Sequence, residues 1–238
     1  MQTFTVVLYL LLSHPECVEP LRHEVETAVA EEGWTKAGLD KMYKIDSFVR
    51  ESLRTHGSGI GSLIPLAKPQ FLMLNSLFLV SVNRIALRPF TFSNGVTVPA
   101  GTVITAPSDI IHRDGEIYPN PEEFDGFRFA KLRESDGFAL PRHQATSTSV
   151  EYLPFGYGRH AWWVISLFVF ASIHRSYSYS PISPGRFFVV SEIKAFLAHI
   201  VVTYDIKFED GKQAPPSIII NSARIPRKAN AMFRKRQK

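Results

Sequence analysis

One glycine-containing stretch decides how this chain is interpreted: Phe155-Gly156-Tyr157-Gly158-Arg159-His160-Ala161. Two glycines flank a bulky residue, and a basic pair follows. Because glycine adopts positive φ angles and lets the backbone approach another group closely, the pattern predicts a tight, hairpin-like loop. After an apolar run and a Ser/Tyr-rich run, the chain continues as Pro184-Gly185-Arg186-Phe187-Phe188.

Joined through a single Cys, the two stretches would spell FGYGRHACPGRFF. That composite resembles the haem-binding loop of the cytochromes P450, the haem-thiolate monooxygenases, in which the Cys is the proximal ligand of haem iron. The resemblance implies haem contacts from the loop residues Phe155, Gly156, Gly158, His160 and Gly185, with His160 on a propionate. The axial Cys is absent, and its place is interrupted between Trp162 and Ser183.

The interruption fits a retained, in-frame intron. A Cys codon is TGT or TGC. If an intron that begins with GT and ends with AG splits it after TG, uninterrupted translation gives TGG (Trp) at one edge and AGT or AGC (Ser) at the other. Trp162 and Ser183 occupy these edges; a genuine loop insertion is the alternative. Residues Ser62–Phe78, which contain Pro65 and Pro69, interrupt a second stretch that is continuous in the family, and we interpret them as a second intron.

Two upstream motifs precede the loop in the order that the family shows. Glu51-Ser52-Leu53-Arg54 places a carboxylate and a guanidinium on one helix face, which taken alone indicates an exposed ion pair. A turn-rich loop then ends in Arg128, between two aromatic residues. By resemblance, Glu51, Arg54 and Arg128 form a buried charge network that fixes the core behind the haem, and loss of one partner would leave a buried charge uncompensated.

Other candidate residues carry weaker signals. Arg84 lies where the family often places an Arg on a haem propionate, and a surface Arg at the end of a strand is an equal alternative. His112-Arg113-Asp114 matches a family stretch that we expect to structure its loop. The remaining histidines have no metal-ligand spacing, which excludes a zinc site of the usual kind. Cys17 is the only cysteine; it excludes a disulfide framework, and we do not expect it to ligate iron.

Hydrophobic periodicity predicts a mainly helical chain. Phe4–Leu12 is apolar all round and predicts a buried helix, and Ser13 with Glu16 fits a capping box for the next helix. That helix has a core face of Val18, Leu21, Val25 and Val29 and stops at Gly33. Thr35 is predicted to cap a short turn. A further helix is predicted to end before Gly57, with apolar residues at Ile45, Phe48, Val49 and Leu53. The last predicted helix runs from Pro184 to about Thr203, and its apolar stripe consists of Val189, Ile193, Phe196, Leu197 and Ile200.

Strands are fewer. Asn94-Gly95, flanked by alternating apolar residues, predicts a hairpin within Arg88–Thr105, and Tyr204–Phe208 alternates like a strand. Asp109–Arg128 is expected to be mostly loop, and Lys131–Ser149 a polar surface meander. The expected fold class is therefore α+β, mainly α: the C-terminal half of the cytochrome P450 fold, with helices and a small antiparallel sheet, forming a single partial domain over residues 1–238.

Charge and hydropathy exclude several other classes. The net charge is +5, and much of the positive excess lies in the tail from Arg224 to Lys238. A basic tail could bind a polyanion or an acidic membrane. Because no nucleic-acid motif accompanies it, we prefer to interpret the tail as a solvated terminus. The apolar runs are too short to span a bilayer, and the basic region of a signal peptide is missing. Family members usually reside in the endoplasmic-reticulum membrane, but we expect no anchor segment in this chain.

The resemblance also implies a function. The family uses haem b (iron protoporphyrin IX), an organic small-molecule substrate and an NADPH-dependent reductase, and it inserts one oxygen atom from O₂ into the substrate. The family's distal half, with its oxygen-activating pair, is expected to be missing, so no catalytic residue is assigned. The alternative is a non-functional fragment from a defective gene model, with no haem bound. For the sequence as written we favour this alternative, and we expect no nucleic-acid partner.

Overall fold

The computed structural model describes residues 2–56, 82–137, 141–158, 161, 185–209, 215, 218–220 and 223–237. Its helices are α1 (Gln2–Ser13), η1 (Pro15–Cys17), α2 (Val18–Glu32), α3 (Lys36–Lys41), α4 (Tyr43–His56), α5 (Ser108–His112), α6 (Arg128–Ser135), η4 (Pro141–His143) and α8 (Gly185–Thr203). Its strands are β1 (Val82–Ile85), β2 (Phe90–Thr91), β3 (Thr97–Val98), β4 (Val103–Ala106), β5 (Tyr204–Phe208), β6 (Ile218–Ile220), β7 (Ala223–Ile225) and β8 (Ala231–Lys235). They form the two-stranded antiparallel pairs β1–β4, β2–β3, β5–β8 and β6–β7, so the predicted mainly helical α+β class is confirmed.

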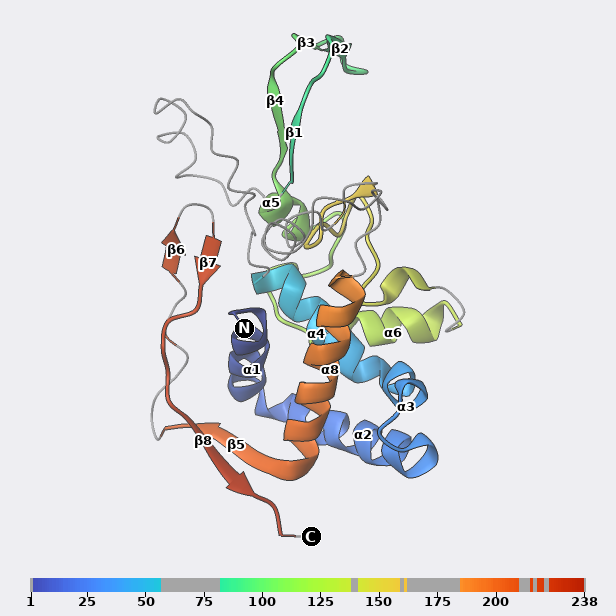
Figure 1. Ribbon diagram of the computed structural model, residues 1–238, viewed down its shortest axis with the longest axis vertical. Coiled ribbons are helices and arrows are strands. Elements are labelled where there is room, and N and C mark those ends of the chain that lie inside the picture. Colours follow the sequence, from blue (N-terminus) through green and yellow to red (C-terminus); the bar gives the residue numbers. More distant parts are fainter. Residues whose placement is uncertain are drawn as a thin grey trace, which may run out of the picture.

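Helix α4 lies at the centre of the helical body, between α1, α2, α6 and α8 (Figure 1). Its residues from Ile45 to Thr55 are all buried, including the ionisable side chains of Asp46, Arg50, Glu51 and Arg54. A helix covered on every side has no solvent face, so each of its charged groups must find a partner inside the protein. The position of α4 therefore determines where the buried polar interactions of this protein lie.

The junction between α1 and α2 corrects the predicted capping box. Helix α1 runs to Ser13, whose hydroxyl donates a hydrogen bond to the carbonyl of Tyr9 one turn back, at 2.9 Å. The 3₁₀ turn η1 follows, and Glu16 pairs with His14 at 2.9 Å instead of bonding back to Ser13. Ser13 is therefore the last residue of one helix and not the cap of the next, because the apolar run continues its helix for one more residue than expected.

The second and third helices have the predicted boundaries. Gly33 ends α2 with φ +67°, and its N–H donates to the carbonyl of Val29 at 2.9 Å. Thr35 caps α3 by accepting a hydrogen bond from the N–H of Gly38 at 3.2 Å. Leu21 and Val25 of α2 are fully buried, which confirms the core face that the helical spacing predicts.

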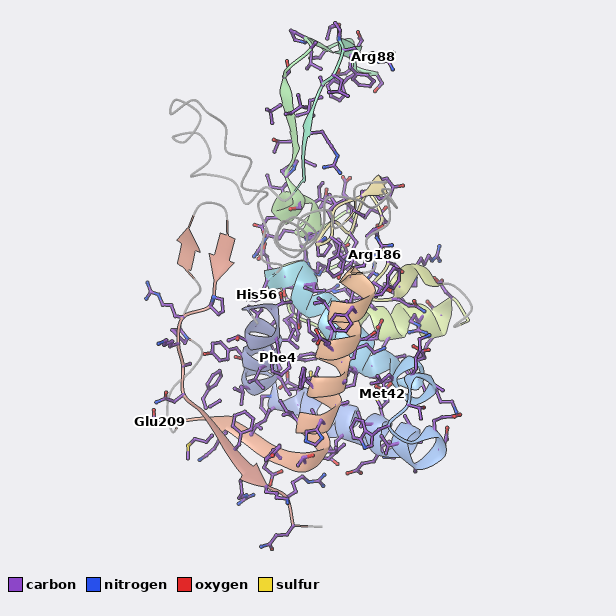
Figure 2. The ribbon with its side chains drawn as sticks, in the orientation of Figure 1. Phe4, Met42, His56, Arg88, Arg186 and Glu209 are labelled. Carbon is purple, nitrogen blue, oxygen red and sulfur yellow. The ribbon has the colours of Figure 1, made fainter. Side chains whose placement is uncertain are left out.

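Strands β1 to β4 form an arm that projects from the helical body (Figure 1). Phe90 pairs with Val98, and Gly95 turns the chain with φ +85° after Asn94, whose side chain accepts the N–H of Val96 at 3.1 Å. The predicted hairpin is thus confirmed. Figure 2 shows Arg88 near the tip of this arm, well away from Met42 in the helical body.

Helix α8 spans the predicted range, and its buried face matches the predicted apolar stripe in part: Ile193 and Leu197 are buried and Val189 packs against the core, whereas Phe196 is not buried. The buried residues are Val190, Ile193, Lys194, Leu197, Ala198 and Val201. Phe196, which the sequence placed in the apolar stripe, is 58% exposed, and its ring lies tilted against that of Phe4 with the centroids 5.7 Å apart. The periodicity selected the face only in part, because apolar residues surround most of this helix.

Two further expectations are corrected toward the C-terminus. The basic tail is not a free solvated end: its residues Ala231–Lys235 form β8 beside β5, Arg234 pairs with Asp205 at 3.0 Å, and Arg236 pairs with Glu26 at 3.0 Å. The stretch Lys131–Ser149 is not entirely a meander either, because Lys131 to Ser135 continue α6.

The proposed interruptions, residues 62–78 and 162–183, lie outside the described residues. Within the described ranges, each helix is too short or too polar to cross a membrane.

Candidate functional site

A buried charge network sits on one side of α4. Arg54 holds Glu51 through two parallel hydrogen bonds, Nε to Oε2 at 2.8 Å and Nη2 to Oε1 at 2.7 Å. Arg128, the first residue of α6, donates from Nε to the same Glu51 Oε1 at 3.1 Å. The structure thus brings together the three residues that the sequence comparison assigned to this network. The exposed helical ion pair that the E-x-x-R spacing alone would indicate is excluded, since neither Glu51 nor Arg54 has an exposed side chain.

Backbone carbonyls complete the network, because two guanidinium groups share one carboxylate. Arg54 Nη1 donates to the carbonyls of His112 at 2.5 Å and Pro121 at 2.8 Å. Arg128 donates to the carbonyls of Pro119 at 2.6 Å, Glu123 at 3.0 Å and Asn120 at 3.3 Å. The loop between α5 and α6 therefore wraps around the two side chains and presents its oxygen atoms to them, which stabilises buried positive charge by charge-assisted hydrogen bonds.

Ser47 and Gly126 fix this loop against α4. The hydroxyl of Ser47 donates to the carbonyl of Gly126 at 2.9 Å and accepts the N–H groups of Phe129 and Ala130 at 3.1 and 3.0 Å. These are among the unpaired N–H groups of the first turn of α6, so the side chain of one helix caps the next. Gly126 itself lies against Phe48, since a Cβ added there would be 2.7 Å from Phe48 Cδ2.

The candidate haem loop follows a buried stem. Tyr152 is fully buried and Leu153 and Phe155 nearly so, whereas Tyr157 is half exposed. Gly156 and Gly158 have φ angles of +73° and +75°, which L-residues with a side chain rarely adopt. The N–H of Gly156 donates to the carbonyl of Leu153 at 3.0 Å and closes the turn. A tight turn with two left-handed glycines is present where the sequence predicts one.

Among the other candidate haem contacts, Arg84 and Gly185 are described by the structure, whereas His160 is not. Arg84 on β1 is exposed, and its Nη2 donates to the carbonyl of Tyr157 at 3.4 Å, so it lies against the loop. Gly185 opens α8. His160 lies outside the described residues, as does the chain between Ala161 and Gly185. The haem role of Arg84, Phe155, Gly156, Gly158, His160 and Gly185 stays a prediction.

The donor set of this chain does not fit a haem iron with a thiolate ligand. The only cysteine, Cys17, is buried where α1 meets α2, and a Cβ added at Gly126 would lie 3.2 Å from its Sγ. Burial raises the pKa of the Cys17 thiol to about 12, and the carboxylates of Glu16 and Asp125 add to the shift, so the thiolate is strongly disfavoured. In the part of the chain that the structure describes, no three His, Cys, Asp or Glu side chains gather as a metal site.

Sequence reasoning missed Arg50, which holds the stem of the loop. Its guanidinium lies 3.9 Å from the ring centroid of Tyr152 and 4.4 Å from that of Phe129, and Nη1 donates to the carbonyl of Gln144. Desolvation lowers the pKa of this buried guanidinium, while the nearby carboxylates of Asp46 and Glu51 act in the opposite direction. Nothing in the sequence marks Arg50, because its partners lie far along the chain.

Comparison with known proteins points to one family. The family model described as Cytochrome P450 matches residues 74–161, so the match ends at Ala161, immediately before the interrupted stretch. The chain is 38% identical over 99% of its length to "Cytochrome P450 monooxygenase 151" of Postia placenta, of which it covers 39%. It is 36% identical over 93% of its length to "Cytochrome P450 monooxygenase CYP512U6" of Ganoderma lucidum, and 33% identical over 94% of its length to "Ent-kaurene oxidase P450-4" of Gibberella fujikuroi. It covers 36% and 37% of these two proteins, so it spans well under half the length of the curated relatives it matches.

Proposed function

The chain belongs to the cytochrome P450 family and is of the fungal type, and from this premise we propose that it is part of a haem-dependent monooxygenase. The reaction would insert one oxygen atom from O₂ into an organic small molecule, with electrons delivered by an NADPH-dependent reductase. The observation that carries the proposal is that this chain has both the buried network of Glu51, Arg54 and Arg128 and a tight two-glycine turn. The network and the turn follow one another in the order that the family shows.

The residues of the loop would form the cradle for haem b. Gly156 and Gly158 have positive φ angles, and without side chains they would let the main chain approach a flat group closely; Phe155 is buried and anchors the turn in the core. Arg84 and His160 would pair with the propionates. When bound, haem would supply the oxygen chemistry, and the protein would supply orientation and exclusion of water.

For the sequence as written we propose the second candidate function, a chain that binds no thiolate-ligated haem. The specific observation is Cys17, whose buried, protonated thiol is committed to the junction of α1 and α2. We propose that residues 162–183 and 62–78 are translated introns, and the end of the family match at Ala161 supports the first of these. The single partial domain over residues 1–238 is then family sequence with two insertions.

Repair of the chain tests both candidates. In the repaired protein, one Cys replaces residues Trp162–Ser183, and residues Ser62–Phe78 are removed. An N-terminal half of the kind found in the cytochrome P450 family is joined to the start of the chain. The matched control carries Ser in place of that Cys. We expect the Cys protein to bind haem and, when reduced under CO, to give the spectrum of a thiolate-ligated haem, and both the Ser control and the original chain to lack that spectrum. The proposal is overturned if the Cys protein takes up haem no better than the Ser control.

A further inference from the structure

We propose that His112 is a positioning residue: its neutral imidazole accepts a hydrogen bond from the N–H of Leu153 and so couples the buried charge network to the candidate haem loop. The proposal rests on the proposed function only in naming that loop a haem loop. The hydrogen bonds themselves are features of this chain, and they can be tested without haem.

His112 is bonded on two sides. It is the last residue of α5 and only 4% exposed. On one side its main-chain carbonyl accepts the 2.5 Å hydrogen bond from Arg54 Nη1. On the other side its ring Nε2 lies 2.9 Å from the N–H of Leu153. A single residue therefore joins the guanidinium that holds Glu51 to the stem of the loop.

The bond to Leu153 fixes the state of the ring. A backbone N–H can only donate, so Nε2 must carry a free lone pair, and the ring must be neutral with its proton on Nδ1. Most of the charged groups that face the ring also favour the neutral imidazole. Burial lowers the pKa of His112 to about 4, and Arg54 and Arg50 on α4 add to this shift, while Asp109 on α5 opposes it. The imidazole is therefore an acceptor at neutral pH.

The peptide groups of Leu153 carry the effect into the turn. The N–H of Leu153 is held by His112, and its carbonyl accepts the N–H of Gly156, at 3.0 Å. A displacement of Leu153 thus moves Gly156, whose φ of +73° begins the turn. His112 therefore acts on the loop through Leu153.

Arg50 also binds the stem of the loop, so the hydrogen bond of His112 can be removed without removing every contact that keeps the stem in place. Tyr152 donates from its hydroxyl to the carbonyl of Arg50 at 3.3 Å, and its ring lies 3.9 Å from the Arg50 guanidinium. The rings of His112 and Tyr152 are also neighbours, with centroids 5.7 Å apart. Because the hold by Arg50 does not depend on His112, loss of the imidazole acceptor should loosen Leu153 and Gly156 without unfolding the stem.

The test compares two substitutions of His112 by amide hydrogen exchange in the full chain. His112→Gln keeps an acceptor oxygen near the position of Nε2, and His112→Leu removes the acceptor at similar size. His199→Gln, on the exposed side of α8, serves as the control. We expect the protection factors of the Leu153 and Gly156 amides to fall at least tenfold in His112→Leu and to stay within about threefold of the parent in the other two. Unchanged protection in His112→Leu overturns the proposal, and so does equal loss in His112→Gln, which would show that only the ring's packing matters.

A pH series provides the second measurement, which needs no leucine variant. Protonation of Nε2 removes the acceptor, so in the parent chain the protection factors of Leu153 and Gly156 should drop as the pH falls through about 4, whereas His112→Gln should show no such step. Parallel curves for the two proteins would contradict the proposal. Since these measurements contain no haem, failure here is distinct from failure of the repaired protein to bind haem.

Discussion

Arg54 and Glu51 form a two-point ion pair inside the protein, with hydrogen bonds of 2.8 and 2.7 Å and no exposed surface on either side chain. A pair in this position has lost its hydration and depends on its remaining partners, here Arg128 and the carbonyls of the α5–α6 loop. The network therefore makes the helical body and the loop interdependent, and its disruption should be visible in stability.

Substitution at Arg54 tests this interdependence. Arg54→Met leaves Glu51 buried with Arg128 as its remaining cationic partner among the described residues, and we expect the free energy of unfolding, measured in urea, to fall by about 3–5 kcal/mol. Arg54→Lys keeps the charge but not the planar fork, and its loss should be intermediate, since an ammonium cannot reproduce both bonds to Glu51. The control is Lys36→Ala in the exposed pair Lys36–Asp40, where we expect a change within about 0.5 kcal/mol. The argument is refuted if Arg54→Met loses less unfolding free energy than the control Lys36→Ala.

A second buried pair ties α8 to α4. Lys194 Nζ lies 3.1 Å from Asp46 Oδ1, both side chains are at most 10% exposed, and Asp46 Oδ2 accepts the N–H of Ala145 at 2.8 Å. Lys194→Met should cost about 3–5 kcal/mol of unfolding free energy, because it leaves an uncompensated carboxylate. Adding Asp46→Asn should recover part of that loss, since the amide oxygen still accepts from Ala145. Strict additivity of the two single losses in a double-mutant cycle would show that the pair is not coupled.

Gly126 is needed for its lack of a side chain. An added Cβ would lie 2.7 Å from Phe48 Cδ2 and 3.2 Å from Cys17 Sγ, so Gly126→Ala should lower stability by about 1–3 kcal/mol through overpacking. Phe48→Leu in the same chain should relieve part of the added strain. Gly115→Ala is the matched control, because no atom lies within 4 Å of its added Cβ. Thermal or urea unfolding measures all three variants, and equal stability of the two Ala variants would refute the packing argument.

The lowered pKa of His112 predicts a pH dependence of stability. The folded protein binds the proton on His112 less tightly than the unfolded chain does. The contribution of the neutral imidazole to the free energy of unfolding is therefore complete above pH 6.5 and is lost as the pH falls from 6.5 to about 4. The shift corresponds to about 3 kcal/mol at most. His112→Gln, which does not titrate, should therefore gain stability relative to the parent over this window. A constant difference in unfolding free energy between the two proteins from pH 7 to pH 4 would contradict the assignment.

Local patterns in the sequence were sufficient for most of the helices and the turns. Gly33, Thr35 and Asn94-Gly95 act through their own backbone geometry or short-range hydrogen bonds, so their roles could be predicted without tertiary structure. The Glu51 and Arg54 motif became informative only with Arg128, because the ordered set matches the family whereas the pair alone resembles any surface ion pair.

What the sequence could not supply depends on partners that are distant in the chain. The bond from Leu153 to His112 spans 41 positions, and the one from Ala145 to Asp46 spans 99, so no local period reveals either. The buried face of α8 was predicted only in part, at Ile193 and Leu197, because apolar residues occupy much of its circumference. The tail was expected to be a solvated terminus because no nucleic-acid motif accompanies its charge, but residues Ala231–Lys235 pair with β5 while Arg234 and Lys235 remain exposed.

The interruption after Ala161 makes a prediction about the messenger RNA. Trp162 and Ser183 are the residues that a split Cys codon would leave at the edges of a translated intron, and the family match stops at Ala161. We expect a spliced message in which the codons for residues 162–183 are replaced by a single TGT or TGC, followed directly by the codon for Pro184. That message would encode a thiol at the start of α8, where the positive end of the helix and its unpaired N–H groups favour a thiolate. Sequencing of full-length transcripts measures this, with the codons on either side as an internal control. Retention of the whole stretch in every message would establish it as a genuine protein insertion, and the haem-ligand assignment would then fail for this chain.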